Sequence, residues 1–398
     1  MRHKRVLPLL ALAALFVPGG PRVDAQSTDT LFDDSTVHDV RLLVNSRDLV
    51  RLYAGFLTNT YYPADFVWNN IRVKNVAIRS RGVGSRNQSK LGLRVDFNRY
   101  TRNQQFLGLR SLVLDNLWQD ATFIRENVTM ALFRRLGQPS PRQSFCRLFI
   151  NNAYVGLYAM VEPVDGAFAA RAFADPDGYL YEYQWVSPFY GEYLGDDFAP
   201  YKLRFHPQTH ELDPDATLYG PLRDLFREIN EPDDAAWRDR VDARIDLAQF
   251  VTQAAIETFL AEEDALLGYQ GMNNFYFYRD RSAGRFRVLP WDRDRSFTFL
   301  ESAVFQNTAA NVLMSRALAY PDLRALYLDV LDAAAGAATT DDWLVSEIER
   351  LASLVAPAAL ADTRKQFSNE EFSQGLEFLR IFAATRPGFV TTEVAAVR

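Results

Sequence analysis

The chain has 398 residues, of which 48% are hydrophobic, 13% aromatic and 24% charged. Domains usually span ~100–200 residues, so this length predicts two lobes or domains with sizeable cores. The formal net charge of −6 argues against nucleic acid as a partner, because sequence-independent binding depends on basic patches. The single cysteine, Cys146, cannot form an internal disulfide, so packing has to supply the stability.

The N-terminus predicts export. A basic start, an apolar run from Val6 to Val17 and small residues near Ala25 are typical of a secretory signal peptide, residues 1–25. The apolar run is shorter than the ~20 residues of a spanning helix. We therefore expect a secreted, extracytoplasmic protein with no transmembrane segment in the mature chain. Residues 26–36 are polar and are expected to form a disordered linker.

Residues 37–165 predict a β-rich lobe, because apolar and polar residues alternate in most of this segment. The expected strands are Asp39–Val44, a strand–turn–strand within Phe66–Ile78, Leu91–Phe97, Phe106–Leu114, Phe145–Ile150 and Tyr154–Val161. Asn151 and Asn152 suit a tight hairpin turn between the last two strands, since asparagine visits positive φ. Helices are expected at Ser46–Tyr53 and Asp120–Gly137, with Asp120 as the N-cap of the second.

The glycine-rich segment Arg79–Lys90 has two interpretations. It carries Arg79, Arg81, Arg86 and Lys90, and such a turn could hold phosphates through backbone N–H groups and cations. It could equally be a solvated hairpin tip. The residues alone leave both interpretations open.

The second half of the chain begins with a helix at Gly166–Phe173 and a strand at Tyr179–Tyr183. From residue 184 onward the chain is rich in Pro, Asp, Tyr and Gly without periodicity, which predicts a loop-rich insertion over residues 166–235. Residues 236–398 are expected to form a mainly helical lobe. Its expected helices are Asp246–Ala261, Ala310–Leu318, Pro321–Ala335, Thr340–Ala356, Leu360–Phe367 and Glu370–Arg386. Strands first and helices later predict an α+β, two-lobed architecture.

Two aromatic runs, Phe275–Tyr278 and Phe286–Leu289, are joined by RDRSAG and predict a β-hairpin. Polar residues flank it: Asp264 and Asn274 come before the hairpin, and Asp292 and Asp294 follow it. A hairpin brings its ends together, so these oxygens could converge on a hard cation such as Mg²⁺. The alternative is that the acids are turn residues or helix caps, paired with Arg293 and Arg295 on a solvated surface.

An asparagine followed by an aromatic Y-x-Y strand, a turn, a strand and P-W-D-x-D-x-S-F resembles the signature of the CotH kinase family. The resemblance covers most of residues 37–335. It implies a two-lobed atypical protein-kinase-like fold, with a β-rich nucleotide-binding N-terminal lobe and a mainly helical C-terminal lobe. It also implies a secreted kinase that uses ATP and Mg²⁺ to phosphorylate Ser or Thr of a protein substrate in the exported or surface fraction.

The same resemblance assigns roles in the β-rich half. Lys90 is expected to pair with phosphate, with Arg81 as a helper. Glu126 is expected to be the partner of Lys90, and Glu162 to lie near the lobe junction and the nucleotide. The alternatives are that Glu126 is a surface residue near a helix N-terminus and that Glu162 is an acid at a strand end.

In the other half, Asp264 is the expected base or hydroxyl-orienting group. Asn274 and Asp292 are the expected Mg²⁺ ligands, and Asp294 is a second ligand or a structural partner. The chain departs from the family pattern at Thr298, where members often have glycine. The competing hypothesis is a non-catalytic pseudokinase: a surface or coat structural protein that binds a protein partner. ATP is scarce outside the cytoplasm, which favours that hypothesis.

Overall fold

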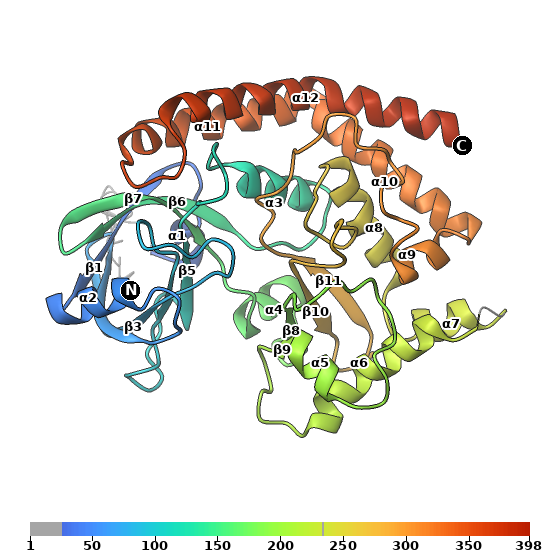
Figure 1. Cartoon of the computed structure of the whole chain (residues 1–398), viewed down its shortest axis with the longest axis horizontal. Coiled ribbons are helices and arrows are strands. Elements are labelled where there is room, and N and C mark those ends of the chain that lie inside the picture. Colours follow the sequence, from blue (N-terminus) through green and yellow to red (C-terminus); the bar gives the residue numbers. More distant parts are fainter. Residues whose placement is uncertain (1–25, 233–234) are drawn as a thin grey trace, which may run out of the picture.

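The computed structural model describes residues 26–232 and 235–398 (Figure 1). The expected signal peptide lies outside the described residues. The N-terminal half forms a closed barrel with the strand order β1-β2-β3-β4-β5-β7-β6. Its strands are β1 (Val37–Val44), β2 (Tyr62–Trp68), β3 (Ile71–Ser80), β4 (Leu93–Asp96), β5 (Ser111–Asp115), β6 (Gln143–Ile150) and β7 (Ala153–Val161).

The barrel closes through one parallel pairing. Val37 of β1 lies opposite Phe145 of β6, and every other neighbouring pair of barrel strands is antiparallel. Alternate residues of the strands point inward, as the period of two requires, and build a buried cluster that includes Val40, Leu42 and Phe66. The predicted β6–β7 hairpin is confirmed. Its turn residues have φ values of 48° and 69°, within the range that asparagine tolerates.

Residues 26–36, which were expected to form a disordered linker, are ordered. A short helix, α1 (Thr28–Leu31), precedes the barrel, and Leu31 is fully buried in the barrel core. The Ser144 hydroxyl on β6 donates to the Leu31 carbonyl at 2.7 Å. The prediction of disorder was wrong because this polar stretch contains two apolar residues, Leu31 and Phe32, that are buried.

A second, four-stranded sheet has the order β11-β10-β8-β9. Its strands are β8 (Tyr179–Tyr183), β9 (Phe205–Pro207), β10 (Phe275–Arg279) and β11 (Phe286–Pro290). The predicted hairpin is thus confirmed as β10 and β11. The segment 166–235 also contains α4 (Gly166–Phe173), α5 (Ala199–Arg204) and α6 (Asp215–Asn230). Its described part, up to residue 232, is not loop-rich from residue 184 onward, because it contains α5, β9 and α6, and β9 pairs with β8.

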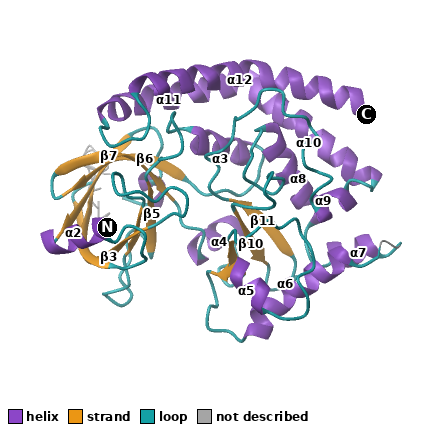
Figure 2. Cartoon of the chain, viewed as in Figure 1, coloured by secondary structure: helices purple, strands orange, loops and turns teal. Residues whose placement is uncertain are grey.

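Helices account for most of the remaining chain (Figure 2). They are α2 (Ser46–Ala54), α3 (Arg125–Arg135), α7 (Trp237–Asp242), α8 (Leu247–Phe259), α9 (Val312–Ala317), α10 (Pro321–Thr339), α11 (Trp343–Ala361) and α12 (Asn369–Val397). A 3₁₀ turn, Thr340–Asp342, joins α10 to α11. In Figure 1, α11 and α12 run along one edge of the molecule, over β7 and α3 at one end and along α10 at the other.

Two expected boundaries are wrong. Residues 362–368 form a connection rather than a helix, because α11 ends at Ala361 and Ser368 starts α12 through a capping box with Glu371. The helix expected from Asp120 begins at Arg125. Asp120 lies before it and accepts hydrogen bonds from the backbone N–H groups of Thr122 and Arg125, at 2.8 and 2.9 Å.

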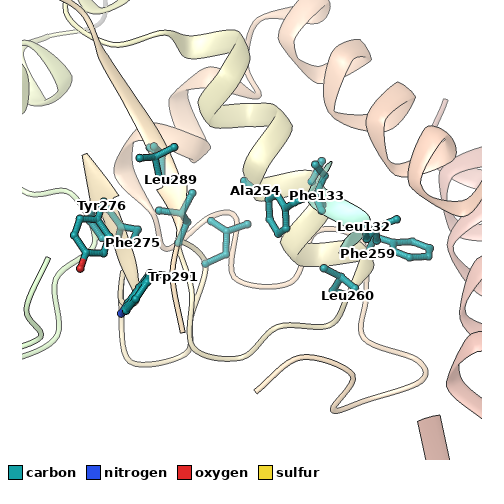
Figure 3. Close-up of a cluster of buried hydrophobic side chains, with 14 of the residues drawn as sticks. Leu132, Phe133, Ala254, Phe259, Leu260, Phe275, Tyr276, Leu289 and Trp291 are labelled. Carbon is teal, nitrogen blue, oxygen red and sulfur yellow. The ribbon is translucent and has the colours of Figure 1, made fainter. Parts of the chain in front are cut away.

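The packing of α3, α8 and the hairpin positions the site. Leu132 and Phe133 of α3, Phe259 of α8 and Trp291 after β11 belong to one buried cluster (Figure 3). The predicted α+β class is confirmed as a mixed architecture of a large β-sheet and helices. None of the described helices has the length and apolar character needed to span a membrane.

Candidate functional site

The open end of the hairpin brings Asn274 beside Trp291, the residue that precedes Asp292. Phe275 pairs with Pro290, so the residues just outside this pair face each other, and the Trp291 N–H donates to the Asn274 carbonyl at 3.2 Å. Asn274 and Asp292 both have left-handed backbones, with φ values of 54° and 53°. Non-glycine residues in this region are uncommon and cluster at functional sites, which is consistent with a site here.

Asp264 is tied to the same hairpin end. It follows α8, and its Oδ2 accepts a hydrogen bond from the side-chain amide of Asn274 at 3.0 Å. Its Oδ1 accepts from the Asn273 amide at 2.9 Å. Two of the residues that precede the hairpin, Asp264 and Asn274, are therefore in direct contact.

The segments around Asp264 and Asp294 are joined through Glu262. One Glu262 oxygen accepts the Asp264 N–H at 2.8 Å, and the other accepts the Ser296 hydroxyl at 2.7 Å. Thr298, the departure from the family pattern, donates its hydroxyl to the Ala261 carbonyl at 2.6 Å. It therefore adds a bond between the two segments rather than disrupting them.

The alternative, in which the WDRD acids pair with Arg293 on a solvated surface, is wrong for this arginine. The Arg293 side chain is fully buried and forms an ion pair with Glu257 of α8. It also donates to the carbonyls of Asn274 and Trp291, at 2.7 and 2.9 Å. Arg293 thus fixes the two ends of the hairpin to α8. Because its side chain is buried, it does not form a surface ion pair with Asp292 or Asp294. Arg295 does reach the surface, where it pairs with Glu263 at 3.3 Å.

Four carboxyl groups act on one another at this place: Asp115 at the end of β5, Glu126 on α3, and Asp292 and Asp294. Burial and then the charge of Asp292 raise the pKa of Glu126 well above its usual range. Burial and then Asp115 raise the pKa of Asp292 to about 6. Burial, followed by Asp292 and Asp115, also raises the pKa of Asp294. Mutual repulsion of this kind is what a bound cation would relieve.

Arg81 is the cation nearest to this cluster from the barrel side. It follows β3, its guanidinium lies 3.2 Å from the Asp115 carboxylate, and it is also 5.8 Å from the Trp291 ring centroid. Its charge favours the ionised form of both Asp292 and Glu126 and so opposes the rise of their pKa values. The role of Arg81 as a phosphate-binding helper stays a prediction.

Lys90 is not paired with Glu126, contrary to expectation. Its ammonium forms an ion pair with Asp362, in the connection between α11 and α12, at 2.7 Å. Glu162 is also misassigned. It binds Arg142 and Arg171, at 2.7 and 2.6 Å, because the end of β7 faces the start of β6 and α4. Its side chain is 3% exposed and both oxygens are used by these arginines, so it is a structural residue.

Sequence analysis missed Asp115 and Asp362. Asp115 ends the apolar strand SLVLD, which is the same signal that identified Asp292 after its strand. Asp362 carried no local signal, because its role depends on a contact between distant parts of the chain. Sequence analysis did not single out Glu262 either.

The donor set fits Mg²⁺ by its chemistry. Asp292 and Asp294 offer carboxylates and Asn274 an amide oxygen, and Mg²⁺ usually takes one or two carboxylates together with substrate phosphates. Within residues 26–232 and 235–398, no three His, Cys, Asp or Glu side chains form a group that could hold a metal ion by themselves. A Mg²⁺ ion held by these three side chains would have to take the rest of its coordination shell from the substrate and from water.

Comparison with known proteins identifies the family. A family model described as CotH kinase protein matches residues 78–390, which is more than half of the chain. The chain belongs to the CotH kinase protein family. The inner spore coat protein H of Bacillus subtilis (strain 168) is 22% identical over 342 residues, covering 84% of this chain and 91% of that protein. The predicted CotH membership is confirmed, and the matched range contains both Arg81 and Asp362.

Proposed function

We propose that the protein is an exported atypical protein kinase that transfers the γ-phosphate of ATP to a Ser or Thr hydroxyl of a surface or exported protein, with Mg²⁺. The observation that carries this proposal is the convergence of Asp264, Asn274 and Asp292 at one end of the hairpin. Their order along the chain parallels the base, the metal-binding Asn and the metal-binding Asp of protein kinases. In this proposal the barrel is the nucleotide-binding lobe and α8 with the hairpin belongs to the catalytic lobe.

Each group has a defined task in the proposed site. Asp292, Asn274 and Asp294 hold Mg²⁺, and Arg81 binds phosphate oxygens from the barrel side. Mg²⁺ bound there would neutralise part of the negative charge of the phosphates. Glu126 lies beside these groups, and burial, followed by the charge of Asp292, raises its pKa.

Asp264 takes the proton of the acceptor hydroxyl. The hydroxyl oxygen forms a bond to the γ-phosphorus as the bond to the β–γ bridging oxygen breaks, and ADP leaves. Hydrogen bonds from Asn273 and Asn274 fix the orientation of the carboxylate before the acceptor arrives. Such positioning carries most of the catalysis in phosphoryl transfer, because the protein does little covalent chemistry.

An extracytoplasmic or coat location belongs to the same proposal. It is supported by the signal-like residues 1–25 and by a relative named as an inner spore coat protein. The protein substrate would then be a component of the same exported fraction.

One observation favours a second candidate, a non-catalytic coat or surface protein that binds a protein partner. Lys90, the expected phosphate-binding lysine, is fully buried against Asp362. A chain that had lost nucleotide chemistry could keep this pair as a structural contact alone.

Phosphate incorporation separates the two candidates. The mature protein is incubated with Mg²⁺ and γ-labelled ATP together with Ser/Thr-containing proteins of the exported fraction, and phosphoserine and phosphothreonine are mapped by mass spectrometry. The kinase proposal predicts Mg²⁺-dependent labelling that Asp292→Asn abolishes. Equal labelling by the wild type and Asp292→Asn, or none by either, would contradict it.

A further inference from the structure

The Lys90–Asp362 ion pair is sealed from solvent. Both side chains are 0% exposed and the two charged groups lie 2.7 Å apart. The ammonium also lies 5.1 Å from the ring centroids of Phe123 and Tyr158. In this arrangement two aromatic rings and a carboxylate enclose the ammonium, so a phosphate oxygen cannot reach it.

The barrel is shaped to receive Asp362. The Asp362 carboxylate accepts the Leu157 N–H of β7 at 3.0 Å and the Arg364 N–H at 2.9 Å. The neighbouring Gly156 has a φ of 135°, and a Cβ there would lie 2.5 Å from the carboxylate oxygen. A side chain at position 156 would thus collide with Asp362. Asp362 would keep both backbone bonds if Lys90 moved away.

Lys90 also lies close to the candidate site through its backbone. The Lys90 carbonyl accepts a hydrogen bond from the Asn116 side-chain amide at 2.7 Å. Asp115, which precedes Asn116, forms the ion pair with Arg81. The charge of Asp115 acts on Lys90 together with that of Asp362. The flexible four-carbon stem of lysine allows one ammonium to serve two anionic partners.

We propose that Asp362 is a positioning residue that latches Lys90 away from the ligand, and that nucleotide binding moves the ammonium from Asp362 to a phosphate. This inference rests on the proposed function, because it assigns a regulatory step to the same site. Breaking a buried ion pair is costly, so the Lys90–Asp362 pair lowers the apparent affinity for the nucleotide. A phosphate offsets this cost by taking the place of the Asp362 carboxylate as the partner of the ammonium. The connection between α11 and α12 thereby controls the barrel side of the site.

The affinity of a non-hydrolysable ATP analogue with Mg²⁺ tests the latch. Calorimetry compares the wild type, Asp362→Asn, Lys90→Met and the double variant. The latch predicts that Asp362→Asn binds about fivefold or more tightly than the wild type, despite a lower melting temperature, and that Lys90→Met cancels this gain in the double variant. Unchanged or weaker binding by Asp362→Asn would overturn it.

Asp120→Asn is the matched control, since it alters another buried carboxylate, one that lies 3.4 Å from the Arg125 guanidinium. It is expected to lower stability without tightening nucleotide binding, and tighter binding by this variant too would contradict a specific role of Asp362. If Asp362→Asn does not fold, a crystal structure of the wild type with the analogue and Mg²⁺ decides the question. Lys90 bound to a phosphate oxygen supports the latch.

The outcomes separate the two proposals. A wild type that binds the analogue with the Lys90–Asp362 pair intact overturns the latch and leaves the kinase proposal standing. Absence of binding by both the wild type and Asp362→Asn overturns the kinase proposal and the latch with it.

Discussion

The side-chain amide of Asn274 donates to the Asp264 carboxylate over 3.0 Å, which joins the end of the α8 segment to the start of the hairpin. The same amide nitrogen also donates to the Asp264 carbonyl at 3.1 Å. Because the nitrogen is committed to Asp264, the amide oxygen of Asn274 is the atom left for a cation. The proposed base and the proposed metal ligand are therefore oriented by one another.

Asp264→Asn is expected to lower turnover by about 100-fold or more, while nucleotide affinity changes much less. The substitution removes the proton acceptor but leaves Asp292 and Arg81 in place. Steady-state kcat and the dissociation constant of the nucleotide are measured on the same preparation. Losses of equal size in both quantities would contradict the role of Asp264 as a base.

Glu262 is expected to act through the position of Asp264. Glu262→Ala removes the acceptor for both the Asp264 N–H and the Ser296 hydroxyl, which should lower kcat and cost about 1–3 kcal/mol of unfolding free energy. Glu262→Gln retains an oxygen for the Asp264 N–H and should recover most of kcat. If the glutamine variant is as inactive as the alanine variant, the hydrogen bond from the Asp264 N–H to residue 262 does not account for the loss of kcat.

Stability without divalent cations should fall as the pH rises through the acidic range. The pKa of Asp292 is raised from 3.8 to about 6 and that of Glu262 from 4.5 to about 7, so the folded protein binds more protons than the unfolded chain in these windows. The unfolding free energy therefore decreases from pH 3.8 to about 7, by on the order of 3 kcal/mol per group.

Urea unfolding at about pH 5 and about pH 8, with and without Mg²⁺, measures this effect. Mg²⁺ should restore stability mainly at the higher pH, where Asp292 is ionised. A constant unfolding free energy across this range, or equal stabilisation by Mg²⁺ at both pH values, would contradict the proposed cation site.

Arg386 of α12 is expected to be essential for the shape of the site. Its buried guanidinium donates to the carbonyls of Thr258 and Phe259 at the C-terminal end of α8, at 2.7 and 2.9 Å. Arg386→Met leaves these carbonyls unpaired and should cost about 3 kcal/mol or more. The control is Arg380→Met on the same helix, which breaks an exposed pair with Glu349 and should cost less than about 1 kcal/mol.

Local patterns predicted the hairpins well. The alternation on either side of Asn151 and Asn152, and the aromatic runs on either side of RDRSAG, specify both strands and turn within a short segment. The parallel contact of β1 with β6 closes the barrel, and no local pattern indicates it because it joins strands far apart in the sequence. Helix α6 was missed because Pro221 and neighbouring polar residues obscure its apolar stripe, which includes Leu222 and Phe226.

The same distinction explains the site. The contact between Asp264 and Asn274 could be predicted because both residues lie in the short segment just before the hairpin, so a local motif contains their geometry. The partner of Lys90 could not be found in this way. Asp362 and Lys90 meet only when the connection after α11 docks on β7, which is a property of the complete fold.

A thermal shift of the mature protein with ATP and Mg²⁺, with ATP alone and with neither tests the central claim most directly. Ligand at ~100 times its dissociation constant stabilises a folded protein by about 2.7 kcal/mol. Asp292→Asn should abolish the Mg²⁺-dependent part of the shift. Asp341→Asn should retain it, since Asp341 is exposed, shares the left-handed backbone of Asp292 and lies between α10 and α11. A wild type that shows no shift at millimolar nucleotide, or a shift that Asp292→Asn keeps in full, would contradict a nucleotide site at this hairpin.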